Sequence, residues 1–238
     1  LSEPRRGLSF ARNAGLARAR HPIVAYLDDD AEAEPTWLAA LVHGFKSHTP
    51  RPACIGGPID AIWDAPRPGW LTDPMLPYLT VLDWQLPAGD LPPDRFIAGA
   101  NMAFDRDALR AGGGFPTNLG RVGSNLSSNE ELVVQRSLRA RGGRCVWEPN
   151  ARVRHHVPPA RLQRSWFVRR YLWQGVSDRV MARAANDGSW SRRRRFRALA
   201  QTGRWCAKAL IAADGTPFGC ACEALRALAF ALPLRSPP

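Results

Sequence analysis

The chain has 238 residues, of which 45% are hydrophobic and 9% aromatic; these values are typical of a globular protein and exclude a disordered one. The formal net charge is +12, and 31 of the 33 basic residues are arginine, which indicates anionic partners such as phosphates, nucleic acid or a membrane surface. Five cysteines without CxxC spacing argue against a zinc site or a disulfide framework, and no apolar run is long enough to cross a bilayer.

The first predicted elements are a helix and a buried strand. Residues 7–17 are rich in alanine and form the predicted helix, on which Arg12 and Asn13 are the unusual polar members. Residues 23–27 are an uninterrupted apolar run, which predicts a strand buried on both faces inside a parallel sheet. Three aspartates, residues 28–30, follow this strand directly.

The aspartate triplet has the composition of a cation site. Ligands of parallel sheets gather at the carboxyl ends of the strands, which is where these aspartates lie. In an extended chain Asp28 and Asp30 point to one side and Asp29 to the other, and their mutual repulsion favours a nearby cation. Carboxylate oxygens suit Mg²⁺ or Mn²⁺ that bridges to substrate phosphates. The residues leave one alternative open, an acidic turn that caps the helix predicted to begin near Pro35.

A second helix, a strand and a long loop follow. Pro35 suits a first helical turn, and apolar residues at helical spacing continue the pattern to Phe45. Residues 53–59 predict a strand in which Gly56-Gly57 allows close backbone approach. Residues 60–95 are rich in Pro, Trp and Asp and show no lasting periodicity. We expect a loop that contacts the acceptor, with a disordered insertion as the alternative.

Five further elements are predicted in the rest of the core. They are a strand at 96–104, a helix at 106–111, a helix that opens at 127–131 and ends at Gly142-Gly143, and short strands at 144–147 and 151–153. A segment that contains His155 and His156 closes this part of the chain.

The chain changes character beyond the core. Aromatic and apolar residues between 166 and 176 alternate with arginines and predict an amphipathic helix, and residues 192–195 are four consecutive arginines. Apolar stretches follow at 198–213 and 218–232. We expect residues 160–238 to form a helical appendage that either lies on a membrane or packs against the main domain.

Taken together, these segments resemble the family 2 glycosyltransferases of the GT-A fold. The resemblance rests on six segments. They are Glu3 with Gly7-Leu8-Ser9-Phe10-Ala11-Arg12-Asn13-x-Gly15, residues 23–30, residues 99–104, Gly113-Gly114-Phe115, Glu130-Glu131, and Ala151-x-Val153-x-His155. The resemblance covers residues 3–180. It implies an α/β fold with a GT-A-like, Rossmann-related mixed sheet flanked by helices, a catalytic core at 1–159 and the helical appendage at 160–238.

Two departures from the family pattern modify this expectation. The family's opening strand and helix, which hold the nucleotide base, have no counterpart, so we expect an N-terminally truncated core. The signature Gln-x-x-Arg-Trp of processive synthases is also absent, because residues 135–139 lack its ending. We therefore expect no processive polymer synthesis.

The resemblance implies an inverting, metal-dependent transfer of a sugar from a nucleotide-sugar donor to a hydroxyl of a glycan or lipid-linked acceptor. Mg²⁺ or Mn²⁺ would neutralise the departing diphosphate. Asp30 would hold the metal, and Asp28 would contact the ribose or the water shell of the metal. His155, with His156 as its competitor, would add a metal or diphosphate contact. We expect such an enzyme in the cytoplasm, where it could also associate peripherally with the inner face of the membrane.

Glu131 is the general base that the resemblance implies, and it would take the proton of the acceptor hydroxyl. It stands where the family has the aspartate of a Glu-Asp pair. A structural rival is a Ser-x-x-Glu capping box, in which Glu131 would bond to the Ser128 N–H. In that case Glu130 becomes the base.

The remaining expected contacts concern the donor. Arg12 and Asn13 would face the nucleotide or its phosphates with Asp28 and Asp29, Gly99 would bring backbone close to the sugar, and Asn101 would bond the sugar hydroxyls.

Three other classes compete with the enzyme. A nucleic-acid-binding protein would explain the charge and the arginines at 192–195, but the sequence carries no nucleic-acid motif, so we expect no specific nucleic acid. A metal-dependent phosphotransferase or nuclease would be built on the aspartate triplet. An inactive glycosyltransferase-like fragment or scaffold would keep the fold without turnover.

Overall fold

The computed structural model describes residues 2–185, 190–211 and 217–232, which divide into two compact units. The sheet unit comprises Leu1–Trp63, Thr80–Thr117 and Glu130–Val157, and the helical unit comprises Asp64–Leu79, Asn118–Asn129 and Pro158–Pro238. The division differs from the expected boundary after residue 159, because residues 64–79 and 118–129 pack with the C-terminal helices and not with the sheet.

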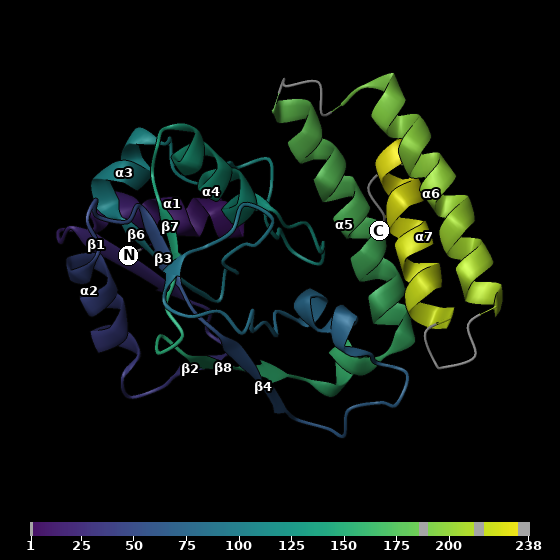
Figure 1. Cartoon of the computed structure of the whole chain (residues 1–238), viewed down its shortest axis with the longest axis horizontal. Coiled ribbons are helices and arrows are strands. Elements are labelled where there is room, and N and C mark those ends of the chain that lie inside the picture. Colours follow the sequence, from purple (N-terminus) through teal and green to yellow (C-terminus); the bar gives the residue numbers. More distant parts are fainter. Residues whose placement is uncertain (1, 186–189, 212–216, 233–238) are drawn as a thin grey trace. The chain divides into compact units, whose positions relative to one another are not determined.

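A five-stranded mixed sheet forms the centre of the sheet unit (Figure 1). Its strands lie in the order β1 (Ile23–Leu27), β6 (Asn101–Asp105), β3 (Cys54–Gly56), β7 (Cys145–Trp147) and β5 (Gly89–Asp90). β3 and β7 are parallel, whereas the other neighbouring strands are antiparallel. The mixed sheet that the resemblance implied is confirmed.

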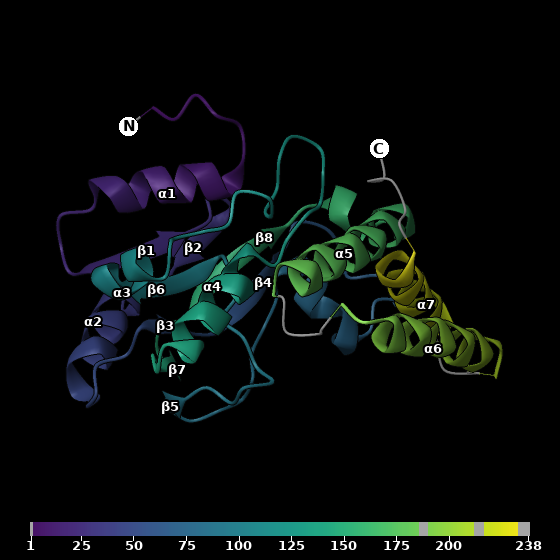
Figure 2. The same cartoon turned by 90° about the horizontal axis from the view of Figure 1, so that it is seen from above.

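Helices cover both faces of this sheet (Figure 2). Side chains of α1 (Leu8–Arg18), α3 (Arg106–Ala111) and α4 (Glu130–Ala140) share one buried cluster with Phe104. Side chains of α2 (Trp37–Ser47) share another with Ala103. Successive residues of a strand point to opposite faces, so Ala103 and Phe104 mark the two faces of the sheet. The helices predicted from periodicity at 7–17, after Pro35 and at 106–111 are confirmed.

β1 differs from its prediction. Among the described residues it pairs only with β6, to which it is antiparallel, so it forms an edge of the sheet. Leu27 is 38% exposed, and Ala25 is also exposed. The prediction of a strand buried on both faces within a parallel sheet is therefore wrong, because an edge strand keeps part of its side chains in contact with solvent.

A second sheet of three strands completes the unit. It has the order β2 (Ala31–Ala33), β8 (Val153–Val157), β4 (Ile59–Trp63), with β8 antiparallel to β2 and parallel to β4. Gly57 connects β3 to β4, and a Cβ at this position would collide with the carbonyl oxygens of Ala151 and Glu148. The close backbone approach predicted for Gly56-Gly57 is thus confirmed.

The segment 60–95 is not a disordered insertion. It contains most of β4, the 3-10 helix η1 (Asp73–Leu79) and β5. Leu71, Met75 and Leu82 are each at most 4% exposed, so the segment contributes apolar side chains to the interiors of both units. Burial of these side chains gives the segment a fixed conformation that its composition did not indicate.

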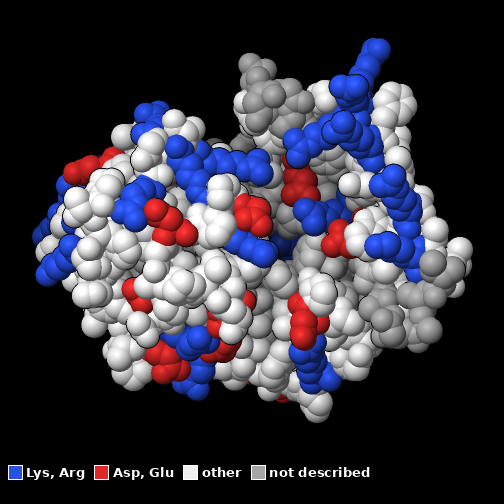
Figure 3. Space-filling model, in the orientation of Figure 1, with Lys and Arg blue, Asp and Glu red and all other residues white. Residues whose placement is uncertain are grey.

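Three helices make up most of the helical unit. After the short 3-10 helix η2 (Pro159–Leu162) come α5 (Arg164–Ala184), α6 (Arg192–Ile211) and α7 (Pro217–Ala231), and α7 packs against both α5 and α6. A Cβ at Gly175 would lie 2.7 Å from the Ala229 Cβ, so α5 and α7 approach each other closely there. None of the described helices combines the length and the apolar character that crossing a bilayer requires. Figure 3 shows basic side chains scattered over the face in view, most of which is neither basic nor acidic.

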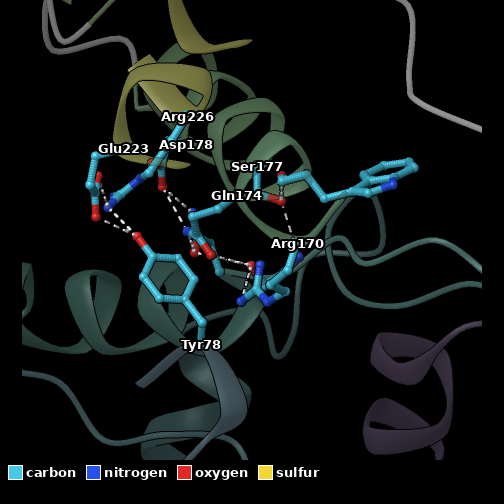
Figure 4. A network of polar contacts seen from close by, with 10 residues as sticks. Tyr78, Arg170, Gln174, Ser177, Asp178, Glu223 and Arg226 are labelled. Atoms are coloured by element: carbon cyan, nitrogen blue, oxygen red, sulfur yellow. Dashed lines mark hydrogen bonds and ion pairs between the residues drawn. The ribbon is translucent and has the colours of Figure 1, made fainter. Parts of the chain in front are cut away.

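A polar network joins α5, α7 and η1 inside the helical unit (Figure 4). The Tyr78 hydroxyl accepts a hydrogen bond from Arg226 Nη1 at 2.8 Å and donates one to Glu223 at 3.1 Å. Asp178 accepts from Arg226 Nε at 2.8 Å and from Gln174 Nε2 at 2.9 Å. Burial raises the pKa of Tyr78, so its hydroxyl keeps the proton that it donates.

Candidate metal and donor site

Asp28, Asp30 and His155 form a cluster in the sheet unit that could hold a metal ion. β1 ends at Leu27, and the Ala31 N–H donates to the Asp28 carbonyl at 3.1 Å, so the aspartates occupy the tight turn between β1 and β2. The three side chains each offer one ligand atom, and these atoms all lie within 4.8 Å of one another. The structure thus brings together the three residues that the resemblance assigned to metal binding.

Asp29, the middle residue of the triplet, is exposed and is not part of this cluster. The alternative of an acidic helix cap is wrong, because β2 separates the triplet from α2. Thr36 precedes α2, and the first turn of that helix carries no acidic residue. The triplet therefore ends a strand and does not begin a helix.

Strand pairing selects His155 over His156. β8 places His155 opposite Ala31 of β2, and the His155 side chain is only 2% exposed, with Nε2 at 3.2 Å from Asp30 Oδ1. His156 points to the other face of β8, where its Nε2 lies 3.3 Å from Glu32. Its backbone N–H donates to the Asp30 carbonyl at 2.9 Å. His156 therefore supports the turn, and only His155 reaches the cluster.

The donor set of the cluster fits a hard divalent cation. Two carboxylates and one imidazole nitrogen suit Mg²⁺ or Mn²⁺ and leave coordination positions for phosphate oxygens and water. The Asp28 and Asp30 side chains are 32% and 34% exposed, so both can be reached from solvent. The residues present thus fit the ion that the resemblance implied.

Arg12 connects this cluster to the start of α4. From α1 its Nη1 donates to Glu130 Oε1 at 2.7 Å, and its Nη2 donates to Asp28 Oδ1 and to the Gly99 carbonyl, both at 3.3 Å. Arg12 is 6% exposed, and its three acceptors are all protein groups. The prediction that Arg12 faces the nucleotide or its phosphates is therefore not supported, because the guanidinium is buried between two carboxylates.

The charges around Arg12 favour a cation. Asp28, Asp30 and Glu130 contribute three formal negative charges and Arg12 one positive charge, which leaves a local excess of two negative charges. A divalent ion would neutralise this excess. Because Arg12 is bonded to both Asp28 and Glu130, the same guanidinium fixes a metal carboxylate relative to the first turn of α4.

Gly99 has a different role from the one expected. A Cβ at this position would lie 2.7 Å from Arg12 Nη2, so a side chain here would displace the guanidinium. The close approach made possible by this glycine is that of Arg12, and the Gly99 carbonyl is already an acceptor of Arg12. The predicted approach of its backbone to a sugar is not supported.

The two glutamates at the start of α4 lie in different surroundings. Glu130 is 4% exposed and is bound to Arg12, whereas Glu131 is partly exposed. The capping box does not form, because α4 begins at Glu130, one residue later than the box requires. The Ser128 N–H donates to Ser177 Oγ at 3.1 Å instead. The reason for preferring Glu130 as the base is thereby removed.

Asn13 and Asn101 are structural residues, contrary to the prediction that they contact the donor. Asn13 Nδ2 donates to the Phe115 carbonyl and its Oδ1 accepts from the Phe115 N–H, both at 2.8 Å. Asn101 is fully buried; its amide donates to the carbonyls of Pro58 and Ala151, and Trp37 Nε1 donates to its Oδ1 at 2.9 Å. Both donor protons of the Asn101 amide are used within the protein, and Asn13 uses its amide oxygen and one of its two donor protons on Phe115.

Gln135 is a supporting residue that the sequence reading missed. Its Nε2 donates to the Ile97 carbonyl at 2.8 Å, and its Oε1 accepts from the Ile97 N–H at 2.9 Å. These bonds fix the chain two residues before Gly99. The sequence could have indicated a position near the site for Gln135, because this residue lies one helical turn after Glu131 and therefore on the same side of α4.

Tyr26 of β1 supports α1 at Arg12. Its hydroxyl donates to the Arg12 carbonyl at 3.2 Å, and its ring packs edge-on against Phe115 with the centroids 5.3 Å apart. Burial raises the pKa of Tyr26 to about 12, so the hydroxyl remains a donor at neutral pH.

The residues that directly precede Glu130 belong to the helical unit and to its polar network. Asn129 has a φ of 79°, a left-handed conformation that asparagine tolerates better than most residues. Its Nδ2 donates to Asp178 and its Oδ1 accepts from Gln174, both at 2.8 Å. These bonds tie the left-handed Asn129 to α5 within the helical unit.

One family model and two known proteins match the sequence. The model of the family described as Glycosyl transferase family 2 matches residues 1–113. The chain is 32% identical over 181 residues to a glucosyl-dolichyl phosphate glucuronosyltransferase of Haloferax volcanii, covering 76% of this chain and 57% of that protein. It is 26% identical over 185 residues to the succinoglycan biosynthesis protein ExoM of Rhizobium meliloti, covering 77% and 56%. The chain thus spans little more than half the length of these two curated relatives.

A solved structure shares the fold. The mannosyltransferase PcManGT from Pyrobaculum calidifontis, determined in complex with GDP-Man and Mn²⁺, matches with a TM-score of 0.52 and 17% sequence identity. The match covers 95% of this chain and 66% of that chain.

Proposed function

We propose that the chain is a family 2 glycosyltransferase and that it catalyses metal-dependent transfer of a sugar from a nucleotide-sugar donor, with inversion at the anomeric carbon. The proposed acceptor is a hydroxyl of a glycan or of a lipid-linked saccharide. The two relatives, a glucosyl-dolichyl phosphate glucuronosyltransferase and a succinoglycan biosynthesis protein, support acceptors of this kind.

One observation carries this proposal. The metal cluster of Asp28, Asp30 and His155 is joined through Arg12 to Glu130, which is followed directly by the candidate base Glu131. A transferase of this kind needs a cation beside the leaving diphosphate and a base beside the acceptor, both at one site. Within the sheet unit, the Arg12 guanidinium joins Asp28 of the cluster to Glu130, the neighbour of Glu131 in the chain.

The proposed roles follow from these positions. Asp30 and His155 would hold Mg²⁺ or Mn²⁺, which would neutralise charge on the departing diphosphate. Asp28, one oxygen of which accepts from Arg12, would contact the ion or the ribose. Glu131 takes the proton from the acceptor hydroxyl as the new bond to the anomeric carbon forms and the bond to the diphosphate breaks. Arg12 and Glu130 act by holding these groups in position.

Glu131 is a better candidate for the base than Glu130. Glu130 is buried, and its Oε1 is occupied by Arg12 at 2.7 Å, so proton uptake there would disrupt a buried ion pair. Glu131 lies outside that pair, and its side chain is partly exposed although its Oε2 is buried. We also propose that the protein acts in the cytoplasm and associates peripherally with the inner face of the membrane.

A transfer assay on the full chain tests this proposal. Release of nucleoside diphosphate from UDP- and GDP-sugars is measured with Mn²⁺ and a synthetic lipid-phosphate glucoside as acceptor. We expect Asp30→Asn and His155→Ala to lower turnover at least about 100-fold, because each removes a proposed metal ligand. Glu32→Gln changes an exposed carboxylate on β2 outside the cluster and should retain activity. Equal turnover of Asp30→Asn and the unmodified protein would contradict the proposal, and a chain that binds Mn²⁺ without any turnover would favour the inactive scaffold.

A further inference from the structure

Helix α6 concentrates positive charge without any negative charge. Its 20 residues include six arginines and one lysine, and none of them is acidic. Its first four residues are the consecutive arginines 192–195. In Figure 3, basic side chains follow the side of the molecule on which Figure 1 draws this helix. Such a segment is attracted to an anionic partner over the distance of a Debye length.

One face of α6 is turned toward the helical unit. Ala198 is 6% exposed, and Thr202, Trp205 and Ala209, which follow it at helical spacing, are partly buried. Arg195, one turn earlier, donates to the Ala231 carbonyl of α7 at 3.1 Å. This face is accounted for by packing within the unit, in which α6 and α7 are neighbours.

A second face of α6 is apolar and exposed. Phe196, Leu199 and Leu210 are 69%, 38% and 87% exposed. At about 100° of rotation per residue these positions lie on one side of the helix, with Gly203 between them. Within the described residues, Phe196 and Leu210 are the two most exposed large hydrophobic side chains. We call Phe196, Leu199 and Leu210 the apolar strip.

A third face of α6 is basic and borders the apolar strip. Arg193, Arg197, Arg204 and Lys208 are all exposed and repeat at intervals of four and seven residues, so they form a row beside the strip. Next to the strip, Arg192, Arg195, Phe196 and Leu199 line a hollow of about 260 Å³. The hollow therefore combines guanidinium groups with apolar side chains.

We propose that α6 docks the helical unit onto an anionic lipid bilayer. The apolar strip enters the boundary between head groups and acyl chains, and the basic row binds the lipid phosphates. A lipid surface satisfies both faces at once. Nucleic acid would bind the arginines but would leave Phe196, Leu199 and Leu210 in water, and a second copy of the chain would bring two basic rows together. The proposal rests on the peripheral membrane association proposed above, to which it assigns a helix and a class of lipid, and it does not depend on the reaction that the sheet unit catalyses.

Vesicle flotation of the full chain tests the proposal. Vesicles of phosphatidylcholine alone are compared with vesicles that contain 30% phosphatidylglycerol. We expect at least about ten-fold stronger partition to the anionic vesicles, with loss of this preference at high salt. Equal binding to both vesicle types would overturn the proposal.

Two variants measure separately how much each exposed face of α6 contributes to vesicle binding. Phe196→Ser with Leu210→Ser should lower partition to anionic vesicles at least about ten-fold, because the apolar side chains no longer leave water. Arg193→Gln with Arg197→Gln, Arg204→Gln and Lys208→Gln should lower it similarly and remove its salt dependence. All these side chains are exposed, so the melting temperatures should stay unchanged, which circular dichroism verifies.

Matched controls lie outside α6. Leu38→Ser changes an apolar residue of α2 that is 59% exposed, and glutamine at Arg18, Arg20, Arg136 and Arg141 removes four exposed charges from the sheet unit. Both controls should keep partition within about two-fold of the unmodified protein. Unchanged vesicle binding by the Phe196/Leu210 variant, tight salt-sensitive binding to a DNA duplex by the same variant, or a dimer that forms through α6 without lipid would each overturn the proposal.

Discussion

Arg12 of the sheet unit and the exposed arginines of α6 in the helical unit act in different ways. In the sheet unit, Arg12 is 6% exposed and is held between Asp28, Glu130 and the Gly99 carbonyl. In the helical unit, the arginines at 193, 194 and 197 are exposed on a helix without acidic residues. The first arrangement fixes carboxylates in place, and the second presents charge to a partner. Net charge alone therefore does not indicate function, because burial and neighbouring carboxylates decide what each arginine does.

The largest effect on sugar transfer is expected from Glu131, the residue that follows Glu130 in the chain. Glu131→Gln should lower transfer by about 10²–10⁴-fold, because the proposed general base is lost. Binding of the nucleotide-sugar, measured by isothermal titration calorimetry, should be retained. Glu130→Gln serves as the comparison and should mainly lower the free energy of unfolding. If Glu130→Gln instead abolished transfer in a fully folded protein, the two roles would have to be exchanged.

Breaking the bridge itself should cost stability. Arg12→Ala leaves Glu130 buried without its counter-charge, and we expect the free energy of unfolding to fall by about 3–5 kcal/mol in urea denaturation. Replacing both partners, Arg12→Met with Glu130→Leu, should recover much of this loss. Arg193→Ala on α6 should change stability by no more than about 0.5 kcal/mol. Similar losses for Arg12→Ala and Arg193→Ala would erase the contrast between the two units.

An intermediate loss of stability is expected from the polar network of the helical unit. Gln174→Ala leaves Asn129 Oδ1 and Asp178 Oδ1 each with one fewer donor, and we expect a loss of about 1–3 kcal/mol in thermal or urea unfolding. Gln201→Ala, at an exposed position of α6, is a suitable control and should have little effect. A neutral Gln174→Ala would show that the network does not stabilise the helical unit.

The smallest effect concerns alkaline pH. The pKa of Tyr26 is raised by burial from its ordinary value of 10.0 to about 12. The folded protein therefore keeps this proton more strongly than the unfolded chain, so the stabilisation is complete below pH 10 and is lost as pH rises toward 12. In Tyr26→Phe the decline of the melting temperature between pH 10 and 12 should be shallower. An identical decline would show that Tyr26 does not titrate in this range.

Local patterns in the sequence predicted much of the secondary structure. The helical spacing after Pro35 and the alanine-rich run at 7–17 gave α2 and α1, because amphipathic periodicity is a local property. The apolar run of β1 was misread as a central strand, since the number of neighbours of a strand depends on distant segments. Residues 64–79 were not recognised as part of the helical unit for the same reason: Leu71, Met75 and Leu79 pack with residues much later in the chain.

The sequence predicted which residues form the acidic cluster, but it did not predict which polar residues support that cluster through hydrogen bonds. Asp28, Asp30 and His155 come together as the resemblance implied. The polar residues Asn13 and Asn101 instead bond to backbone groups more than 40 residues away, which no local pattern reveals. The Ser-x-x-Glu pattern also misled, because the left-handed Asn129 shifts the start of α4 by one residue.

Binding of Mn²⁺ to the full chain, followed by electron paramagnetic resonance, tests the central claim most directly. If Asp28, Asp30 and His155 hold the ion, Asp30→Asn should weaken Mn²⁺ binding by at least about 10-fold, whereas Glu32→Gln should leave it unchanged. Equal Mn²⁺ affinity in the unmodified protein and Asp30→Asn would contradict the account.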